Sequence, residues 1–91
     1  MDNLVNEREV RMFYVYMLRC KDNSLYTGWT TDVERRTQEH KKGVGGKYTR
    51  ARLPVVLVYT ENMETKQDAM KREYAIKQLS KSKKEKMILE K

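Results

Sequence analysis

The run from Phe13 to Cys20 constrains the fold more than any other part of the chain. It reads Phe-Tyr-Val-Tyr-Met-Leu-Arg-Cys, so it is rich in aromatic residues and is apolar on both alternating faces. A strand with one face in water alternates apolar and polar residues, whereas this pattern is typical of a strand with neighbours or cover on each side. We therefore expect it at the centre of a sheet.

Residues 21–29 supply turn chemistry, Lys-Asp-Asn-Ser, and then a returning strand, Leu-Tyr-Thr-Gly-Trp. They predict a β-hairpin, whose loop length decides which side chains share a face. If Asn23 takes the left-handed position of a three-residue loop, Tyr16 lies opposite Gly28. Tyr26 is then on the same face as Tyr16, whereas a two- or four-residue loop puts the two tyrosines on opposite faces. A simpler interpretation is that both are ordinary strand aromatics that bury area.

Helix signals follow the hairpin. Thr31 or Asp32 suits the N-cap of a helix over 33–42, and Gly43 suits its end, where a positive φ is favoured. The later expected elements are a flexible basic loop over 43–52, a buried strand over 55–60, a helix that opens with a capping-box spacing over 65–68 and reaches about Leu79, and a last short helix through 87–89 capped by Ser80 or Ser82. The order β-β-α-β-α-α is of the α+β class, with an antiparallel hairpin, a third strand and helices that cover the sheet.

The size of the chain suits one small domain. It has 91 residues, of which 38% are apolar and 36% charged, so the core must be thin. We expect residues 1–12 to form a loosely ordered N-terminal extension and residues 13–91 to form the domain. The single cysteine, Cys20, excludes an internal disulfide and a cysteine zinc cluster. No run approaches the ~20 apolar residues that cross a bilayer, and the N-terminus lacks a secretion signal, so we expect a cytoplasmic protein.

The charge balance favours a polyanionic partner. Twenty Lys and Arg against thirteen Asp and Glu give a net charge of +7, which is typical of proteins that bind nucleic acid or an anionic membrane surface. The residues that we expect to contact phosphates are Lys47, Tyr48, Arg50 and Arg52. The lysine-rich tail over 81–86 is weaker evidence, because such helix faces commonly serve solubility.

Two residues of the first helix are candidates for chemistry. Arg36 and His40 are spaced i,i+4, so they point the same way. One cation and one titratable imidazole on a common face could bind a phosphate and help to move a proton. The simpler alternative is a solvated face that carries a lone surface histidine.

Glu73 is the candidate on the later helix. Helical spacing puts it on the inward stripe, close to Ala69. A buried carboxylate without a partner is costly, so we expect it to meet an arginine, a metal ion or hydroxyl donors. A structural ion pair with Arg35 or Arg36 is an equal alternative.

Taken together, these residues resemble a known family. The motifs, in order, are Tyr14-Val15-Tyr16, then Tyr26-Thr27-Gly28, then Thr31-Asp32-Val33-Glu34-Arg35-Arg36 with His40, and a later Glu73. This set is similar to the GIY-YIG nuclease domain, in its small stand-alone bacterial form, and the likeness covers about Phe13 to Leu89. It implies a three-stranded antiparallel sheet flanked by helices. It also implies metal-dependent hydrolysis of nucleic-acid phosphodiesters, with DNA rather than a membrane as the partner.

The resemblance further implies a role for each matching residue. On the hairpin, Tyr16 matches the tyrosine that activates the attacking water, Tyr26 matches the second tyrosine, which hydrogen-bonds within the site, and Gly28 matches the glycine that keeps the backbone close-packed. On the helices, Arg36 matches the arginine that stabilises the phosphate, His40 matches a nearby helper residue, and Glu73 matches the metal-ligating carboxylate. The implied cofactor is a divalent metal, Mg²⁺ or Mn²⁺. One carboxylate binds such an ion weakly, so the substrate phosphate must supply further ligands.

Some positions depart from the family pattern. Tyr14 and Val15 replace the Gly and Ile of the first motif, Thr27 replaces the Ile of the second, and residues 74–91 contain no Asn where many active members have one. We therefore weigh an endonuclease that acts on DNA in repair or recombination against a catalytically weak or inactive nucleic-acid-binding module on the same fold. An adaptor that docks an acidic protein is a third alternative. We expect sequence specificity to be low or to come from a protein partner.

Overall fold

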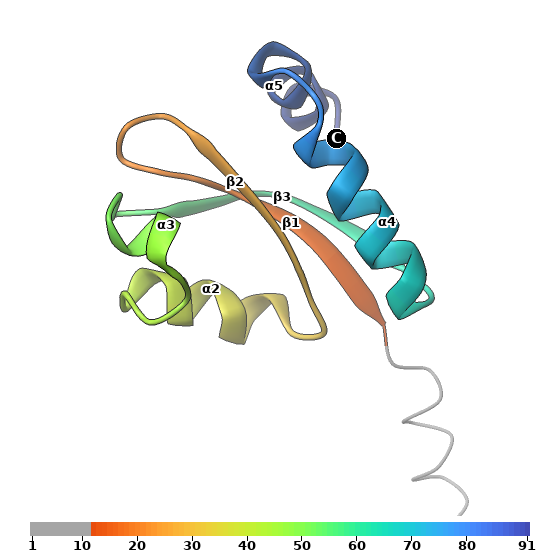
Figure 1. Cartoon of the computed structure of the whole chain (residues 1–91), viewed down its shortest axis with the longest axis horizontal. Coiled ribbons are helices and arrows are strands. Elements are labelled where there is room, and N and C mark those ends of the chain that lie inside the picture. Colours follow the sequence, from red (N-terminus) through yellow and green to blue (C-terminus); the bar gives the residue numbers. More distant parts are fainter. Residues whose placement is uncertain (1–11) are drawn as a thin grey trace, which may run out of the picture.

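The computed structural model describes residues 12–91 (Figure 1), so most of the predicted N-terminal extension lies outside the described residues. In chain order the elements are β1 Phe13–Arg19, β2 Leu25–Thr30, α2 Val33–Lys41, α3 Lys47–Arg50, β3 Val56–Met63, α4 Lys66–Lys77 and α5 Lys81–Glu90. Apart from the short α3, this is the predicted order β-β-α-β-α-α. None of the helices in residues 12–91 is long and apolar enough to span a membrane.

The three strands form an antiparallel sheet in the order β2-β1-β3, which confirms the central place predicted for β1. Its side chains are buried on both faces. Val15 and Met17 join a cluster with Ala69 and Ile76 of α4, while Tyr16 and its neighbours form a second cluster on the other face. Helices α4 and α5 therefore cover one face, and α2 and α3 lie beyond the other (Figure 1).

The hairpin between β1 and β2 has the three-residue loop that was one of the open alternatives. The amide of Cys20 donates to the carbonyl of Ser24 over 2.9 Å, and Asn23 has a φ of 71°. The left-handed conformation at Asn23 is one that a short polar side chain tolerates. In the resulting register, Tyr16 lies opposite Gly28.

Helix starts follow the predicted caps. The side chain of Asp32 accepts a hydrogen bond from the amide of Arg35, and Thr65 accepts one from Asp68, each over 3.0 Å. Ser80 caps α5 in the same way. These side chains satisfy amides that have no partner within the helix. Gly43, with a φ of 83°, follows the end of α2 as expected.

Two predictions for the second half of the chain were wrong. The run over 55–60 was expected to be a buried strand, but β3 lies at the sheet edge, and Val56 and Leu57 are 57% and 36% exposed. A short apolar run does not reveal whether its second edge has a neighbour. The basic segment over 43–52, expected to be a flexible loop, contains the helical turn α3.

A bidentate ion pair fixes α5 against the end of β1. The guanidinium of Arg19 donates to both carboxylate oxygens of Glu85, over 2.6 and 2.7 Å. Lys81 contacts the same carboxylate over 2.7 Å. Such paired bonds fix orientation as well as position, so α5 is held with Lys84 beside β2, at the edge of the sheet.

Candidate active site

The hydroxyl of Tyr16 is the centre of the site. Its side chain comes from the middle of β1 and is 1% exposed, and its oxygen lies 2.9 Å from Nε2 of His40. A Cβ atom on Gly28, the cross-strand partner, would lie 2.7 Å from that oxygen. Only a residue without a side chain leaves room for the phenol over β2.

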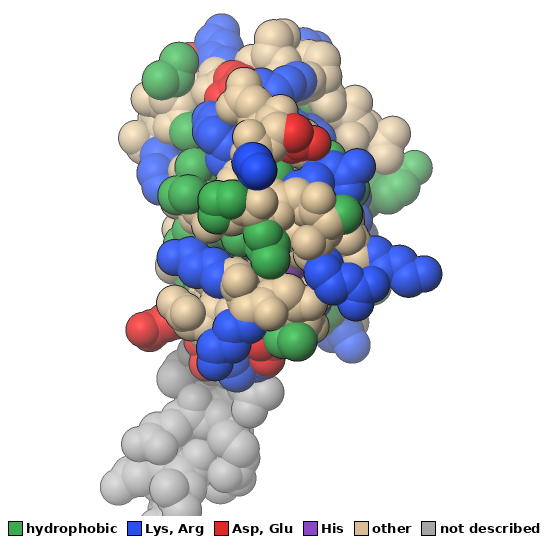
Figure 2. Space-filling view, turned by 90° about the vertical axis from the view of Figure 1, so that its left-hand side faces the viewer, with side chains coloured by type: hydrophobic (Ala, Val, Ile, Leu, Met, Phe, Trp, Pro, Cys, Tyr) green, Lys and Arg blue, Asp and Glu red, His purple; other side chains and the backbone are tan. Residues whose placement is uncertain are grey.

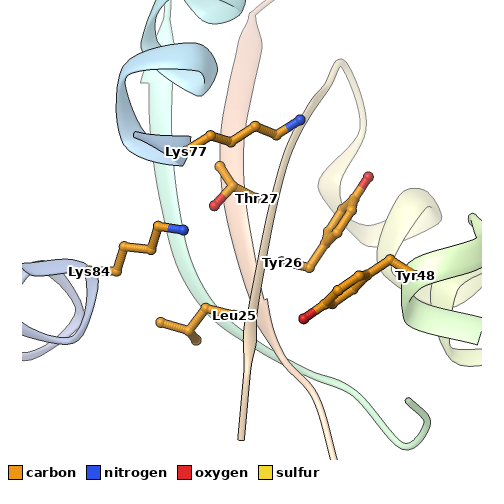
Figure 3. A pocket seen from close by; sticks show the side chains of 6 residues that line it. All are labelled: Leu25, Tyr26, Thr27, Tyr48, Lys77 and Lys84. Atoms are coloured by element: carbon orange, nitrogen blue, oxygen red, sulfur yellow. The ribbon is translucent and has the colours of Figure 1, made fainter. Parts of the chain in front are cut away.

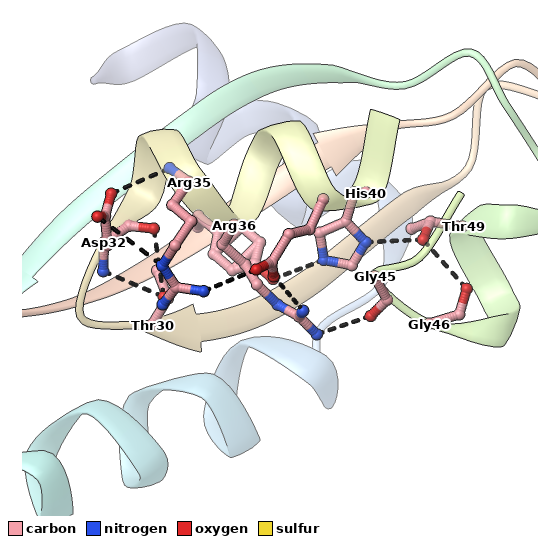
Figure 4. A network of polar contacts seen from close by, with 10 residues as sticks. Thr30, Asp32, Arg35, Arg36, His40, Gly45, Gly46 and Thr49 are labelled. Carbon is pink, nitrogen blue, oxygen red and sulfur yellow. Dashed lines mark hydrogen bonds and ion pairs between the residues drawn. The ribbon is translucent and has the colours of Figure 1, made fainter. Parts of the chain in front are cut away.

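His40 connects the phenol to the segment around α3 (Figure 4). Its Nδ1 lies 2.7 Å from the hydroxyl of Thr49, and both residues are 0% exposed. A Cβ on Gly45 would lie 2.5 Å from Nδ1, so this glycine packs directly on the imidazole. The alternative of a lone surface histidine on α2 was therefore wrong.

Burial controls the ionisation of both groups. Loss of solvation raises the pKa of Tyr16 to about 12, the neighbouring Tyr26 adds to this rise, and the charge of Arg36 opposes it. Loss of solvation and then the charge of Arg36 lower the pKa of His40 below its ordinary value. Both rings are therefore neutral at pH 7.

Arg36 lies beside this pair and is held by two oxygens. Its guanidinium donates to Glu39 over 2.8 Å and to the carbonyl of Gly45 over 2.6 Å. Arg35 donates to the other oxygen of Glu39 over 2.8 Å. These contacts hold a positive charge in a fixed position near the phenol of Tyr16. The hydrogen bond to Glu39 raises the pKa of Arg36 above its ordinary value.

Glu73 approaches from α4, on the other face of the sheet. Its side chain is 21% exposed, and its ion-pair partner is Lys77 at 3.5 Å. The expected alternative of an ion pair with Arg35 or Arg36 was therefore wrong. The charge of Glu73 still contributes to the raised pKa of Tyr16, so the carboxylate lies within electrostatic reach of the phenol.

A cavity of about 240 Å³ crosses the β2 edge beside these groups. In Figure 3 Tyr26 and Tyr48 lie on one side of β2, and Lys77 and Lys84 on the other. The Tyr26 ring also lies 5.1 Å from that of His40, centroid to centroid. The hydroxyl of Tyr26 makes none of the hydrogen bonds found within residues 12–91, so the hydrogen bond that the resemblance implies for it is not formed in this structure.

The predicted phosphate-contacting residues divide into two kinds. Arg52 stacks 3.7 Å from the centre of the Tyr48 ring and donates to Asp22 over 3.1 Å, so it braces the loop. Lys47 and Arg50 are exposed. The face around α3 and the hairpin turn carries many Lys and Arg side chains among apolar ones (Figure 2).

Comparison with known proteins agrees with this geometry. The model of the GIY-YIG catalytic domain matches residues 12–86. The chain belongs to the GIY-YIG family. This confirms the resemblance and the fold class inferred from the motifs.

Relatives within the GIY-YIG family are also small proteins. UPF0213 protein SH2523 of Staphylococcus haemolyticus is 58% identical over 77 residues, which cover 85% of this chain and 94% of the relative. The solution NMR structure of UPF0213 protein BH0048 from Bacillus halodurans is 51% identical with a TM-score of 0.58, over 88% of this chain and 85% of that one. The NMR structure of EF2693 from E. faecalis is 44% identical, also with a TM-score of 0.58, over 85% and 82%.

GIY-YIG nucleases are generally metal-dependent, so we asked which side chains of this chain could hold a divalent ion. Within residues 12–91 no three His, Cys, Asp or Glu side chains gather into a metal-binding group. Glu73 is a half-buried carboxylate whose cationic neighbour Lys77 lies at the longer distance of 3.5 Å. Mg²⁺ is commonly held by one or two carboxylates together with water and substrate phosphate. Glu73 fits that kind of ion and would hold it weakly.

Thr49, Gly45 and Glu39 surround this GIY-YIG site but were not predicted. Thr49 and Gly45 contact the imidazole, and Glu39 fixes the guanidinium of Arg36. The segment containing Thr49 was recognised for its charge, and its hydroxyl gave no signal of its own. For Glu39 a signal was present, because its i,i+3 spacing from Arg36 puts the two residues side by side on a helix.

Proposed function

We propose that the protein is an endonuclease that hydrolyses phosphodiester bonds of DNA. The observation that carries the proposal is the buried contact of Tyr16 with His40. The charges of Arg36 and Glu73 both act on the phenol of Tyr16. A phenol with an imidazole can supply the base that phosphodiester hydrolysis uses, a guanidinium can stabilise the charge on the phosphate, and a carboxylate can hold a metal ion.

In this mechanism Tyr16 and His40 act together as the base. A phenol with a pKa of about 12 and an imidazole with a lowered pKa do not exchange a proton in the resting state, since that gap corresponds to more than about 7 kcal/mol. The transfer must therefore accompany the attack. The water proton passes to the Tyr16 oxygen while the phenol proton passes to Nε2 of His40.

Arg36 stabilises the charge that the phosphate gains. Its contacts with Glu39 and Gly45 fix the guanidinium before substrate binds, so little reorganisation accompanies the reaction. Glu73 would hold the divalent ion, which, when bound, supplies positive charge to the phosphate and the leaving oxygen. Lys77 would exchange its contact with Glu73 for one with substrate.

The substrate surface extends along the β2 edge. The cavity lined by Tyr26, Tyr48, Lys77 and Lys84 joins ring faces to ammonium groups, which suits bases and phosphates together. Contacts of this kind carry little sequence information, so we propose that the substrate is branched, damaged or single-stranded DNA. The process would be DNA repair or recombination, and the location the cytoplasm. A protein partner would supply further specificity.

The test is cleavage of plasmid, duplex, flap and single-stranded DNA with Mg²⁺ or Mn²⁺. We expect Tyr16→Phe, Arg36→Ala and Glu73→Gln each to lower cleavage at least about 10²-fold. Matched controls are Tyr14→Phe on the same strand and Lys41→Ala, which removes an exposed cation from the helix that carries Arg36. Cleavage that survives the three site variants would come from a contaminant and would remove the proposal.

The second candidate is a nucleic-acid-binding module without turnover. The observation that favours it is the absence of Asn from residues 74–91 of a chain with a net charge of +7. Binding that weakens with salt, with no cleavage of any substrate at any metal concentration, would select it.

A further inference from the structure

The proton of the Tyr16 hydroxyl needs an acceptor. The side chain is 1% exposed, and the hydrogen bond that its hydroxyl makes within residues 12–91 is the one to Nε2 of His40. The neighbouring guanidinium of Arg36 only donates. A neutral phenol here therefore favours an Nε2 that carries no proton, because two facing donors would leave a buried polar group unsatisfied.

Thr49 makes the complementary contact on the other side of the ring. Its hydroxyl lies 2.7 Å from Nδ1 of His40 and 3.5 Å from the carbonyl oxygen of Gly46, one turn earlier. The hydroxyl has one proton, and directing it to the carbonyl leaves its lone pairs for Nδ1–H. The two ends of the imidazole therefore favour the same tautomer.

We propose that Thr49 is a positioning residue that holds His40 as the Nδ1–H tautomer, so that Nε2 faces Tyr16 as an unprotonated acceptor. The proposal rests on the proposed function, because it deepens the part that His40 plays there. In the opposite tautomer Nε2 already carries a proton. The phenol then has no neighbour to receive its own proton, and the relay stops.

Local structure fixes this arrangement. Thr49 lies in α3, which begins two residues after Gly45, and a Cβ on Gly45 would overlap the imidazole of α2. The carbonyl of Gly45 also accepts the Arg36 guanidinium over 2.6 Å. The segment around α3 therefore binds the Arg36 guanidinium and orients His40, whereas its charged residues Lys47 and Arg50 are exposed.

The chain contains one histidine, so its tautomer can be read directly from an untagged, ¹⁵N-labelled sample. Long-range ¹H–¹⁵N spectra at pH 7.5, without DNA or metal, show which ring nitrogen is protonated. We expect protonated Nδ1 and unprotonated Nε2 in the wild type and in Thr49→Ser, which keeps the hydroxyl. In Thr49→Val we expect the Nδ1–H signature to be lost in favour of Nε2–H or a mixture.

A matched control is Thr37→Val, because Thr37 is also buried but its hydroxyl has no partner within residues 12–91. That variant should keep the wild-type tautomer. An Nε2–H tautomer in the wild type, or an unchanged tautomer in Thr49→Val, would overturn the proposal. The wild-type spectrum can overturn the proposal even if Thr49→Val does not fold.

Cleavage provides the second measurement. Thr49→Val should lose up to about 10²-fold in kcat with KM little changed, since orientation of the base contributes to the chemical step, and Thr49→Ser should recover it. Equal rates for the two variants would contradict the proposal. If the wild-type protein cleaves no DNA, the proposed function fails, whereas the tautomer and its dependence on Thr49 remain measurable.

Discussion

Gly28 lies directly opposite Tyr16 across the β1–β2 ladder, and the phenol occupies the space that a side chain at position 28 would fill. The backbone of β2 therefore packs directly against the Tyr16 hydroxyl. This relationship gives the motif glycine a steric reason that is independent of its φ angle, since Gly28 lies within a regular strand.

We expect Gly28→Ala to displace the Tyr16 hydroxyl from His40. The new Cβ would lie 2.7 to 3.0 Å from three atoms of the phenol, and such overpacking costs about 1–3 kcal/mol. Urea unfolding should show that loss of stability. The rate of DNA cleavage should fall by more than this loss of folded protein explains, because the distance between the Tyr16 hydroxyl and Nε2 of His40 changes. A variant with wild-type cleavage would show that the phenol position does not matter.

His40 should make stability depend on pH. Its folded-state pKa is lowered, chiefly by burial, so the unfolded chain takes up a proton near pH 6.5 while the folded protein does not. Stability is therefore full above about pH 6.5 and falls as pH decreases below it, by up to about 1.4 kcal/mol per pH unit, until the folded pKa is reached.

The check is urea unfolding at pH 7.5, 6.5 and 5.5 for the wild type and for His40→Gln. The variant should be less stable at pH 7.5 and lack the part of the slope due to the imidazole. Because the chain has one histidine, a ring titration with a midpoint at or above 6.5 in the folded protein would contradict the expectation.

The hairpin and its register were largely predictable from sequence because their determinants are local. Turn residues, a residue suited to a positive φ and a continuous apolar run all lie within seventeen positions of one another, from Phe13 to Trp29. Helix starts at Asp32 and Thr65 were readable for the same reason.

The environment of the site was not predictable because it depends on packing between layers. Burial of His40 requires α3 and Gly45 to close over it, and the residues of that segment signalled only a basic loop. The alternative ion pair of Glu73 with Arg35 or Arg36 was wrong because α4 lies on the opposite face of the sheet from α2. Helical spacing gives the side of a helix that faces inward, but not the layer that the helix joins.

Helix α5 should depend on the Arg19–Glu85 contact. The hydrogen bond from Arg19, and then that from Lys81, lower the pKa of Glu85 to about 2. The stability that the contact contributes is therefore full above about pH 4.5 and is lost as pH falls to about 2. We expect Glu85→Gln to speed amide hydrogen exchange in α5 at pH 7 while α2 is unaffected. Glu90→Gln, on the same helix at a more exposed position, is the control, and equal exchange in both variants would contradict the role of the pair.

Lys84 should contribute one phosphate contact to DNA binding. It is half-buried at the cavity beside Tyr26 and Tyr48, whereas Lys86 lies outside it and pairs loosely with Glu90 at 4.0 Å. A cation that neutralises a phosphate releases a counterion, so Lys84→Ala should reduce the slope of log K against log salt by about 1. Lys86→Ala removes the same charge from the same helix and should leave the slope nearly unchanged. Equal slopes for the two variants in fluorescence anisotropy would mean that the tail attracts DNA only through its net charge and that the cavity at the β2 edge is not on the path of the strand.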